Sequence, residues 1–300
     1  MYSTYPTPSI FESLSFSSLN KREEVVTLLN HKEKWALVFD FERNRLHSRC
    51  IIRYIDLERK IVKETRSKAL RFKIKSTFAP LPFVDEALTF TGGGFTSSLI
   101  SKNSSYRLLS AIPDFFRIKT DISFSLDKSS PSYNQLYSKN RLFETFHASF
   151  SNTVSGTISK EEKKKEMKTE DYALYYTWKV SSFPLKRDSI IISANGVENN
   201  IPFSLFYNPK TNKITLIREE KTTIDDVEIK QENSKIYLVS QRTKIEAKIF
   251  APIKEKSGPY RLERSINYAL FSGTISHFSF SQALGVIELS SKRMKKSISQ

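Results

Sequence analysis

The sequence predicts an all-β protein. Three observations predict it: segments in which apolar and polar residues alternate, turn signals between those segments, and no sustained alternation of strand and helix patterns. The chain has 300 residues, of which 39% are apolar and 12% aromatic, so it can hold one large or two medium domains, each with its own core. Many short strands at regular spacing are typical of a β-barrel or a β-sandwich.

Two stretches show the strand pattern most clearly. From Ile118 to Leu126 every second residue is Ile, Thr, Phe or Leu, and the residues between them are Lys, Asp or Ser. Residues 243 to 250 oppose apolar residues to lysine and glutamate in the same way, and residues 71 to 75 also alternate. One apolar face and one polar face indicate an antiparallel sheet that covers a core.

Turn signals lie between such segments. Residues 208 to 212 read Asn-Pro-Lys-Thr-Asn and separate the apolar stretches 203–207 and 214–217, which predicts a β-hairpin. Residues 195 to 200 read Asn-Gly-Val-Glu-Asn-Asn and predict a second hairpin turn.

The start of the chain departs from the strand pattern. Residues 1 to 18 are expected to form a loose leader. Asn20 and Glu23 then resemble the capping pair of a helix, and the apolar residues that follow have helical spacing. These apolar residues are Val25, Val26, Leu28 and Leu29. A short helix that ends near His31 is therefore predicted.

Charge and cysteine content limit the classes of protein and of partner. The net charge of +16 can attract nucleic acid, anionic lipid or an acidic protein. No segment combines basic and aromatic residues in a known module, so we expect no specific nucleic acid partner and at most a weak association with an anionic membrane surface. Cys50 is the single cysteine, so neither a disulfide framework nor a disulfide-linked partner is expected.

The sequence gives no sign of export or of membrane insertion. The first residues have neither the basic nor the apolar region of a secretory signal, and no apolar run is long enough to span a bilayer. We therefore expect a cytoplasmic protein.

Familiar chemical motifs are missing. A zinc site needs several converging ligands, but the histidines are scattered, and Gly92–Gly94 is not followed by the Gly-Lys-Ser/Thr of a phosphate-binding loop. No Gly-x-Ser-x-Gly elbow occurs. The sequence therefore predicts no metal, no cofactor and no catalytic residue.

The order of several short segments resembles a bacterial family catalogued as domain of unknown function 2804. Members carry a Ser-Gly-Thr segment, an Asp-Trp-x-Arg-Gly box, a Ser-Ala-Asn-Gly turn, a Pro-Phe strand and a late His-Gln-x-Phe-Gly stretch. The matching positions in this chain are Ser155–Thr157, Trp178, Ser193–Gly196, Pro202–Ser204, His277, Phe280 and Gly285. The shared order extends over about residues 60 to 290.

This resemblance implies a specific architecture. The family is similar to carotenoid hydratases and AttH-type proteins, which resemble two lipocalin-like β-barrels in tandem. The expected fold is therefore two tandem lipocalin-like antiparallel β-barrels, or barrel-like sandwiches, with a short N-terminal helix. We assign residues 1–30 to the leader and helix, residues 31–168 to the first β domain, and residues 169–300 to the second β domain with its basic tail.

The resemblance also implies which points of the two halves correspond. It makes Gly156 and Gly285 equivalent. The tetrapeptide Ser-Gly-Thr-Ile occurs at Ser155–Ile158 and again at Ser272–Ile275. If Gly156 and Gly285 correspond, the second copy is a coincidence.

The departures from the family pattern bear on activity. The box is degraded to Thr177-Trp178-Lys179-Val180-Ser181, in which the aspartate falls on Thr177, the arginine falls on Val180, and only Trp178 remains. Threonine cannot replace a carboxylate in proton transfer near neutral pH. We therefore expect that chemistry based on this box is lost and that enzymatic activity is less favoured than binding.

Five residues are candidates for contact with a ligand. They are Tyr176, Trp178, His147, His277 and Asn195. Trp178 is expected to line a cavity or to pack in a core. Each histidine is either a titratable group facing a cavity or a structural residue. Tyr175 and Tyr176 lie on opposite faces of a strand, so at most one of them faces an interior.

The favoured function is binding of an apolar or amphipathic small molecule, a lipid or isoprenoid, in a β-barrel without turnover. One alternative is a lipid-modifying hydratase or isomerase with a relocated site, which requires a buried carboxylate or histidine inside a barrel. The other is an interaction protein that docks a basic surface on an anionic membrane or a protein partner. That alternative requires filled interiors and a clustered basic face.

Overall fold

The computed structural model describes most of the chain from residue 20 to residue 291. The described ranges are 20–43, 47–70, 86–92, 95–102, 105–113, 117–125, 133–139, 142–151, 153–182, 189–209, 211–257 and 262–291. The chain divides into two compact units, Met1–Pro184 and Leu185–Gln300, called unit 1 and unit 2 below. Within the described residues, no helix is long and apolar enough to cross a membrane. The described secondary structure is strand, apart from the short 3-10 segment η2 (Thr169–Asp171), so the all-β fold class is confirmed.

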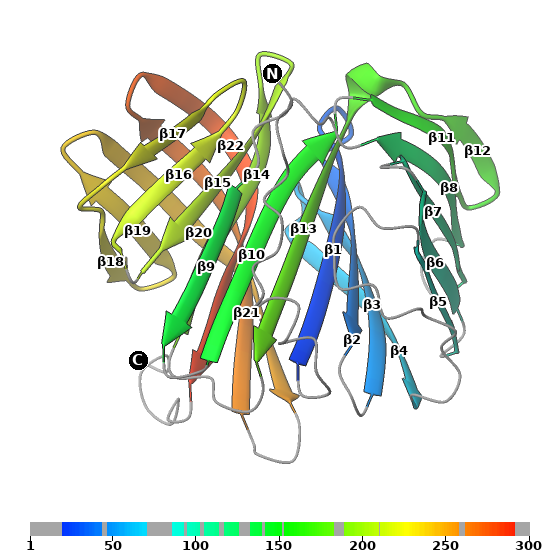
Figure 1. The fold of residues 1–300 in the computed structure, drawn as a ribbon. Helices are drawn as coiled ribbons and strands as arrows, with labels where there is room; N and C mark the ends of the chain where they lie inside the picture. The colour runs from blue at the N-terminus through cyan, green and yellow to red at the C-terminus, as the bar shows by residue number, and fades with distance from the viewer. Residues whose placement is uncertain are drawn as a thin grey trace. The chain divides into compact units, whose positions relative to one another are not determined.

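Unit 1 contains a seven-stranded antiparallel sheet with the strand order β4-β3-β2-β1-β13-β10-β9 (Figure 1). Its strands are β1 (Asn20–Asn30), β2 (Trp35–Arg43), β3 (His47–Asp56), β4 (Ile61–Leu70), β9 (Tyr133–Lys139), β10 (Leu142–Ser151) and β13 (Tyr172–Ser182). The structure places the division between the units after Pro184 and not after Lys168, because β13 pairs with β1 and β10 of the first unit.

A second, six-stranded antiparallel sheet completes unit 1, with the order β12-β11-β8-β7-β6-β5. Its strands are β5 (Glu86–Gly92), β6 (Phe95–Lys102), β7 (Ser105–Ile112), β8 (Ile118–Ser125), β11 (Thr153–Lys160) and β12 (Lys163–Glu166). The strand predicted at residues 118–126 is confirmed over Ile118–Ser125 as β8, whose alternate side chains are buried, and Leu126 lies outside the described residues. The predicted alternation at residues 71–75 lies outside the described residues.

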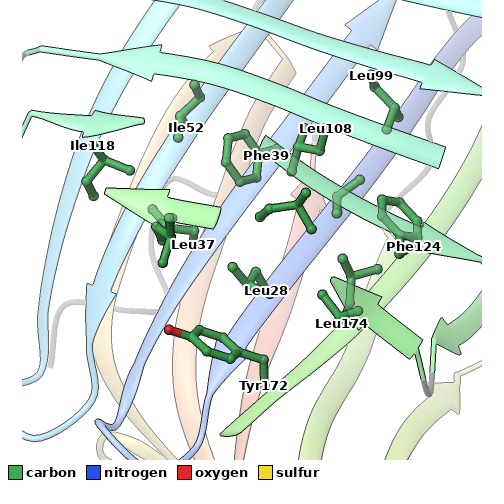
Figure 2. Packing of buried hydrophobic residues seen from close by; sticks show 14 of the residues in the cluster. Leu28, Leu37, Phe39, Ile52, Leu99, Leu108, Ile118, Phe124, Tyr172 and Leu174 are labelled. Atoms are coloured by element: carbon green, nitrogen blue, oxygen red, sulfur yellow. The ribbon is translucent and has the colours of Figure 1, made fainter. Parts of the chain in front are cut away.

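The core of unit 1 lies between its two sheets. Figure 2 shows how Leu28, Phe39 and Leu174 of the seven-stranded sheet meet Leu108 and Phe124 of the six-stranded sheet. These side chains are buried, so their removal from water stabilises the contact between the sheets by about 25 cal/mol per Å² of apolar area.

Cys50 belongs to the same core and is completely buried. Burial raises the pKa of its thiol well above the ordinary value, because the thiolate would lose its hydration. Cys50 is therefore an inert, small apolar side chain in the folded protein.

The helix predicted for residues 20–31 is wrong, because residues 20–30 form the strand β1. This strand pairs with β2 on one side and with β13 on the other. Val26 and Leu28 enter the core, and Leu29 on the opposite face is also buried. A strand buried on both faces carries adjacent apolar residues, and this pattern resembles helical spacing.

Unit 2 is one nine-stranded antiparallel sheet with the order β17-β16-β15-β14-β22-β21-β20-β19-β18. Its strands are β14 (Ser189–Glu198), β15 (Ile201–Asn208), β16 (Lys213–Ile217), β17 (Lys221–Ile224), β18 (Glu228–Glu232), β19 (Lys235–Ser240), β20 (Thr243–Ser257), β21 (Leu262–Ile275) and β22 (Phe278–Ser291). Ile224 of β17 and Ile229 of β18, from the two ends of the order, contact one apolar cluster. The sheet therefore curls around its own core.

Two predictions for unit 2 are confirmed. The hairpin expected around residues 208–212 is formed by β15 and β16, in which Tyr207 pairs with Ile214. The strand expected at residues 243–250 is the first part of β20, and its Ile245 and Ala247 are buried. The turn expected at residues 195–200 narrows to Asn199 and Asn200, both with positive φ, because β14 continues to Glu198.

The recurring Ser-Gly-Thr-Ile marks the same backbone geometry in both units. Gly156 has φ +128° and Gly273 has φ +145°, and a Cβ on either would lie 2.1 Å from a backbone carbonyl oxygen of the neighbouring strand. Gly285 is different, because a Cβ there would meet the ring of Phe271 at 2.2 Å. By this geometry the equivalence of Gly156 with Gly285 is wrong, and Gly273 is the counterpart of Gly156.

We predict that Gly273→Ala lowers the free energy of unfolding by about 2–4 kcal/mol, because alanine must adopt a glycine backbone conformation and its Cβ collides with the Lys244 carbonyl. Urea unfolding followed by circular dichroism measures the loss. Ser272→Ala, at an exposed neighbour, is the control and should stay within about 0.5 kcal/mol of the parent chain. Equal effects of the two substitutions would contradict the prediction.

Candidate functional site

A buried carboxylate and a tyrosine hydroxyl meet inside unit 1. Tyr176 of β13 donates a hydrogen bond from its hydroxyl to Oε2 of Glu24 on β1, with a donor–acceptor distance of 2.8 Å. Glu24 is 4% exposed and Tyr176 is 1% exposed. Along β1, Glu24 alternates in step with Val26 and Leu28, so it belongs to the face that carries the core. The pair therefore places a polar centre among the apolar side chains of the core.

Aromatic rings surround this pair. Tyr176 packs against Tyr106 of β7, with ring centroids 5.4 Å apart, and Tyr106 stacks on Phe124 of β8 at 5.0 Å. The centre thus joins a carboxylate of one sheet to aromatic side chains of the other. Such a combination of apolar walls and a few polar groups is typical of small-molecule sites.

Further hydroxyl groups lie in the same core. Ser110 of β7 and Thr120 of β8 face each other across their strands and share a hydrogen bond of 2.7 Å. Both are buried, as is Ser97 on the neighbouring strand β6. Ser97 pairs with Ser110 across β6 and β7, whereas the next core-facing pair on these strands is Leu99 with Leu108. The serine pair therefore fills less of the core than the leucine pair.

The other face of the seven-stranded sheet carries buried ion pairs. Arg53 Nε lies 2.6 Å from Glu64 Oε2, and its Nη1 lies 3.6 Å from Asp40 Oδ2. Glu42 and Arg49 form a second pair with an Nε–Oε2 distance of 2.6 Å. Because these residues alternate with the core residues along β2 and β3, the sheet separates an ionic face from the apolar interior.

The structure brings some predicted site residues together and separates others. Tyr176 lies in the core, as described above, and Tyr175 lies on the opposite face of β13. Trp178 pairs through its backbone with Glu24 on β1 and with His147 on β10. The side chains of Trp178 and His147 lie outside the described residues.

The remaining predicted residues lie in unit 2. Asn195 alternates with the core residues of β14 and accepts a hydrogen bond from the Ser204 hydroxyl at 2.8 Å, so it faces away from the unit 2 core. His277 is exposed in the turn between β21 and β22. Neither residue joins the Glu24–Tyr176 pair.

Sequence reasoning missed Glu24, which is the carboxylate of the site. The helix predicted for residues 20–31 gave Glu24 no role, whereas in the strand β1 its side chain lies in the core. An available signal was its position two residues before Val26 in a segment rich in β-branched residues. Within the described residues, no three metal-ligating side chains come together.

Comparisons with known proteins identify the fold. No family model and no curated protein matches the sequence. Among solved structures, kievitone hydratase from Nectria haematococca has a TM-score of 0.61 at 12% identity, with 97% of this chain and 94% of that chain covered. CghA with Sch210972 has a TM-score of 0.54 at 10% identity, with coverage of 91% and 89%. An AttH-type protein from Nitrosomonas europaea has a TM-score of 0.56 at 9% identity, with coverage of 91% and 92%.

These identities are low, so the similarity concerns the fold alone. The chain has the lipocalin-like fold of these proteins, and the expected resemblance to AttH-type proteins is supported at that level. Membership of the family catalogued as domain of unknown function 2804 stays a prediction.

We predict that Tyr176→Phe lowers the free energy of unfolding by about 1–3 kcal/mol, because the buried Glu24 carboxylate loses a hydrogen-bond donor that water cannot easily replace. Tyr207→Phe is the matched control in unit 2. Its hydroxyl donates to the neutral oxygens of Asn212 and Val227 at 3.2 and 3.3 Å, so the expected loss is only about 0.5–1.5 kcal/mol. A smaller loss for Tyr176→Phe than for the control would contradict a strong buried contact.

Proposed function

We propose that this chain binds an apolar or amphipathic small molecule, such as a lipid or isoprenoid, in the interior of unit 1. The observation that carries the proposal is the Glu24–Tyr176 hydrogen bond, which is buried among apolar and aromatic side chains. A carboxylate is expensive to bury, and apolar side chains of similar volume would stabilise a purely structural core at least as well. Its presence favours a core with a ligand-binding role.

The fold supports this proposal. Lipocalin-like barrels have room for one small ligand. Two of the similar structures carry names that point to small molecules, kievitone hydratase and CghA with Sch210972. The degraded box at residues 177–181 favours binding without turnover.

The first test is native mass spectrometry of the full chain purified from its own cells, followed by organic extraction. We expect a stoichiometric lipid or isoprenoid. Leu28→Phe, which adds bulk to the unit 1 core, should reduce the bound fraction, whereas Leu238→Phe in the unit 2 core should not. Circular dichroism checks that both variants fold. A bare chain mass under gentle conditions would contradict the proposal and favour an interaction protein that docks on a membrane or a protein partner.

A second candidate function is favoured by the chemistry of the same pair. A carboxyl group and a phenol in hydrogen-bond contact can give a proton to a bound molecule and take one back. Hydration of a carbon–carbon double bond adds a proton to one carbon and the oxygen of water to the other, and the water returns a proton to the pair. Isomerisation removes an allylic proton and returns it at a different carbon. Glu24 would be the proton-transfer residue in either reaction.

The two reactions leave different isotopic marks on an unsaturated ligand obtained by the extraction. We expect a hydratase to add one molecule of ¹⁸O-labelled water, and an isomerase to incorporate deuterium from D₂O without a gain of water. Glu24→Gln keeps the shape of the side chain and removes its acid, so it should abolish either label while the ligand still binds. Full labelling of the ligand by the Glu24→Gln variant would contradict a role of Glu24 in proton transfer. If the parent chain leaves the ligand unlabelled, the result supports binding without turnover.

A further inference from the structure

Three aromatic side chains form a rim at one end of the unit 1 core. Trp35, at the start of β2, stacks on Tyr54 of β3 with ring centroids 6.1 Å apart and an interplanar angle of 26°. Trp35 also meets Tyr172 of β13 edge-on at 5.8 Å. All three belong to the apolar core cluster and are buried. This aromatic rim is the end of the core nearest the turn between β1 and β2.

A carboxylate is held against the rim by donors from both sheets. Oε2 of Glu33 accepts a hydrogen bond from Trp35 Nε1 at 3.0 Å, and its Oε1 accepts one from Lys165 Nζ of β12 at 2.6 Å. The backbone nitrogen of Glu33 donates to Asn30 Oδ1 at 2.7 Å, which fixes the turn. The hydrogen bonds from Lys165 and Trp35 lower the pKa of Glu33 below its ordinary value, because they stabilise the charged form.

A second lysine adds positive charge at this end. Lys160 of β11 is half-buried, and its Nζ lies 4.9 Å from the ring centroid of Tyr54 and donates to the Tyr54 hydroxyl at 3.1 Å. Its charge contributes further to the lowered pKa of Glu33. One indole N–H and two ammonium groups thus converge where a carboxylate borders an apolar core.

The Glu33 carboxylate can be displaced from its position beside Trp35 and Lys165. The side chains of Glu33 and Lys165 are 44% and 59% exposed, and exposed ion pairs contribute little to stability. Glu33 also lies on a surface turn, from which its side chain can swing into water. Met167, which follows β12 and is buried in the core cluster, is an unbranched side chain that can repack around an acyl chain.

We propose that this end of unit 1 binds the carboxylate of an amphipathic long-chain acid, which takes the place of the Glu33 carboxylate between Trp35, Lys160 and Lys165. This inference rests on the proposed function and specifies its ligand class.

The spacing along β1 sets the length of the ligand. Asn30 pairs with Trp35 beside the rim, and Glu24 lies six residues away along the same strand. Six strand residues span about 20 Å. A long acid with its carboxylate at the rim therefore extends along the core towards the Glu24–Tyr176 pair.

The experiment compares cis-parinaric acid with its methyl ester by fluorescence titration of the full chain at low ionic strength. The acid should bind more tightly than the ester. Glu33→Gln removes the competing carboxylate and should tighten binding of the acid about fivefold without changing the ester. Lys160→Gln should weaken binding of the acid about fivefold and leave the ester unchanged.

Glu246→Gln is the matched control. It removes the partner of Lys235 from an ion pair of 2.8 Å in unit 2, where the side chains are 40% and 38% exposed, and should change neither titration. If acid and ester bind equally and Glu33→Gln affects neither, the inference is overturned and the proposed function stands. If neither probe binds to the parent chain or to Glu33→Gln, the inference is overturned, and a bare chain mass in the extraction test would overturn the proposed function as well.

Discussion

Burial of the seven-stranded sheet on both faces is the constraint on which unit 1 depends. The strand β1 lies in the middle of the order, with partners on both sides, and its residues on both faces are removed from water. Each polar side chain on such a strand needs a hydrogen-bond partner or an opposite charge, because water cannot supply one. This requirement explains why Glu24 meets the Tyr176 hydroxyl, and why charged residues on the other face form pairs.

The two faces of the sheet give these polar groups two different environments. On one face, arginine and carboxylate neighbours compensate each other, and removal of one partner from such a pair would leave an uncompensated buried charge at a cost of about 3–5 kcal/mol. On the other face, the carboxylate of Glu24 is set among apolar and aromatic side chains. The second environment is the one in which a carboxyl group can act on a bound molecule, because little water competes for it. The function proposed for unit 1 follows from this difference.

The sequence predicted two strands in which one face contacts water, and one hairpin that is marked by a turn signal. β8 and the first part of β20 were predictable because apolar and polar residues alternate in them, and β15 and β16 because an Asn-Pro turn separates two apolar stretches. β1 was mistaken for a helix because a strand buried on both faces does not alternate. The Glu24–Tyr176 pair could not be predicted from the sequence for another reason. Its members are 152 positions apart in the chain, and the pairing of β1 with β13 brings them together.

Cys50 gives unit 1 an internal reporter. Thiol reagents are attacked by the cysteine thiolate, and the side chain of Cys50 is completely enclosed between the two sheets. Modification therefore requires a transient separation of the two sheets, so its rate measures how often such openings occur. Because the chain has one cysteine, the signal comes from this interior alone. A cysteine that is inert in the folded core thus reports the openings of unit 1, including those that a ligand would need in order to enter.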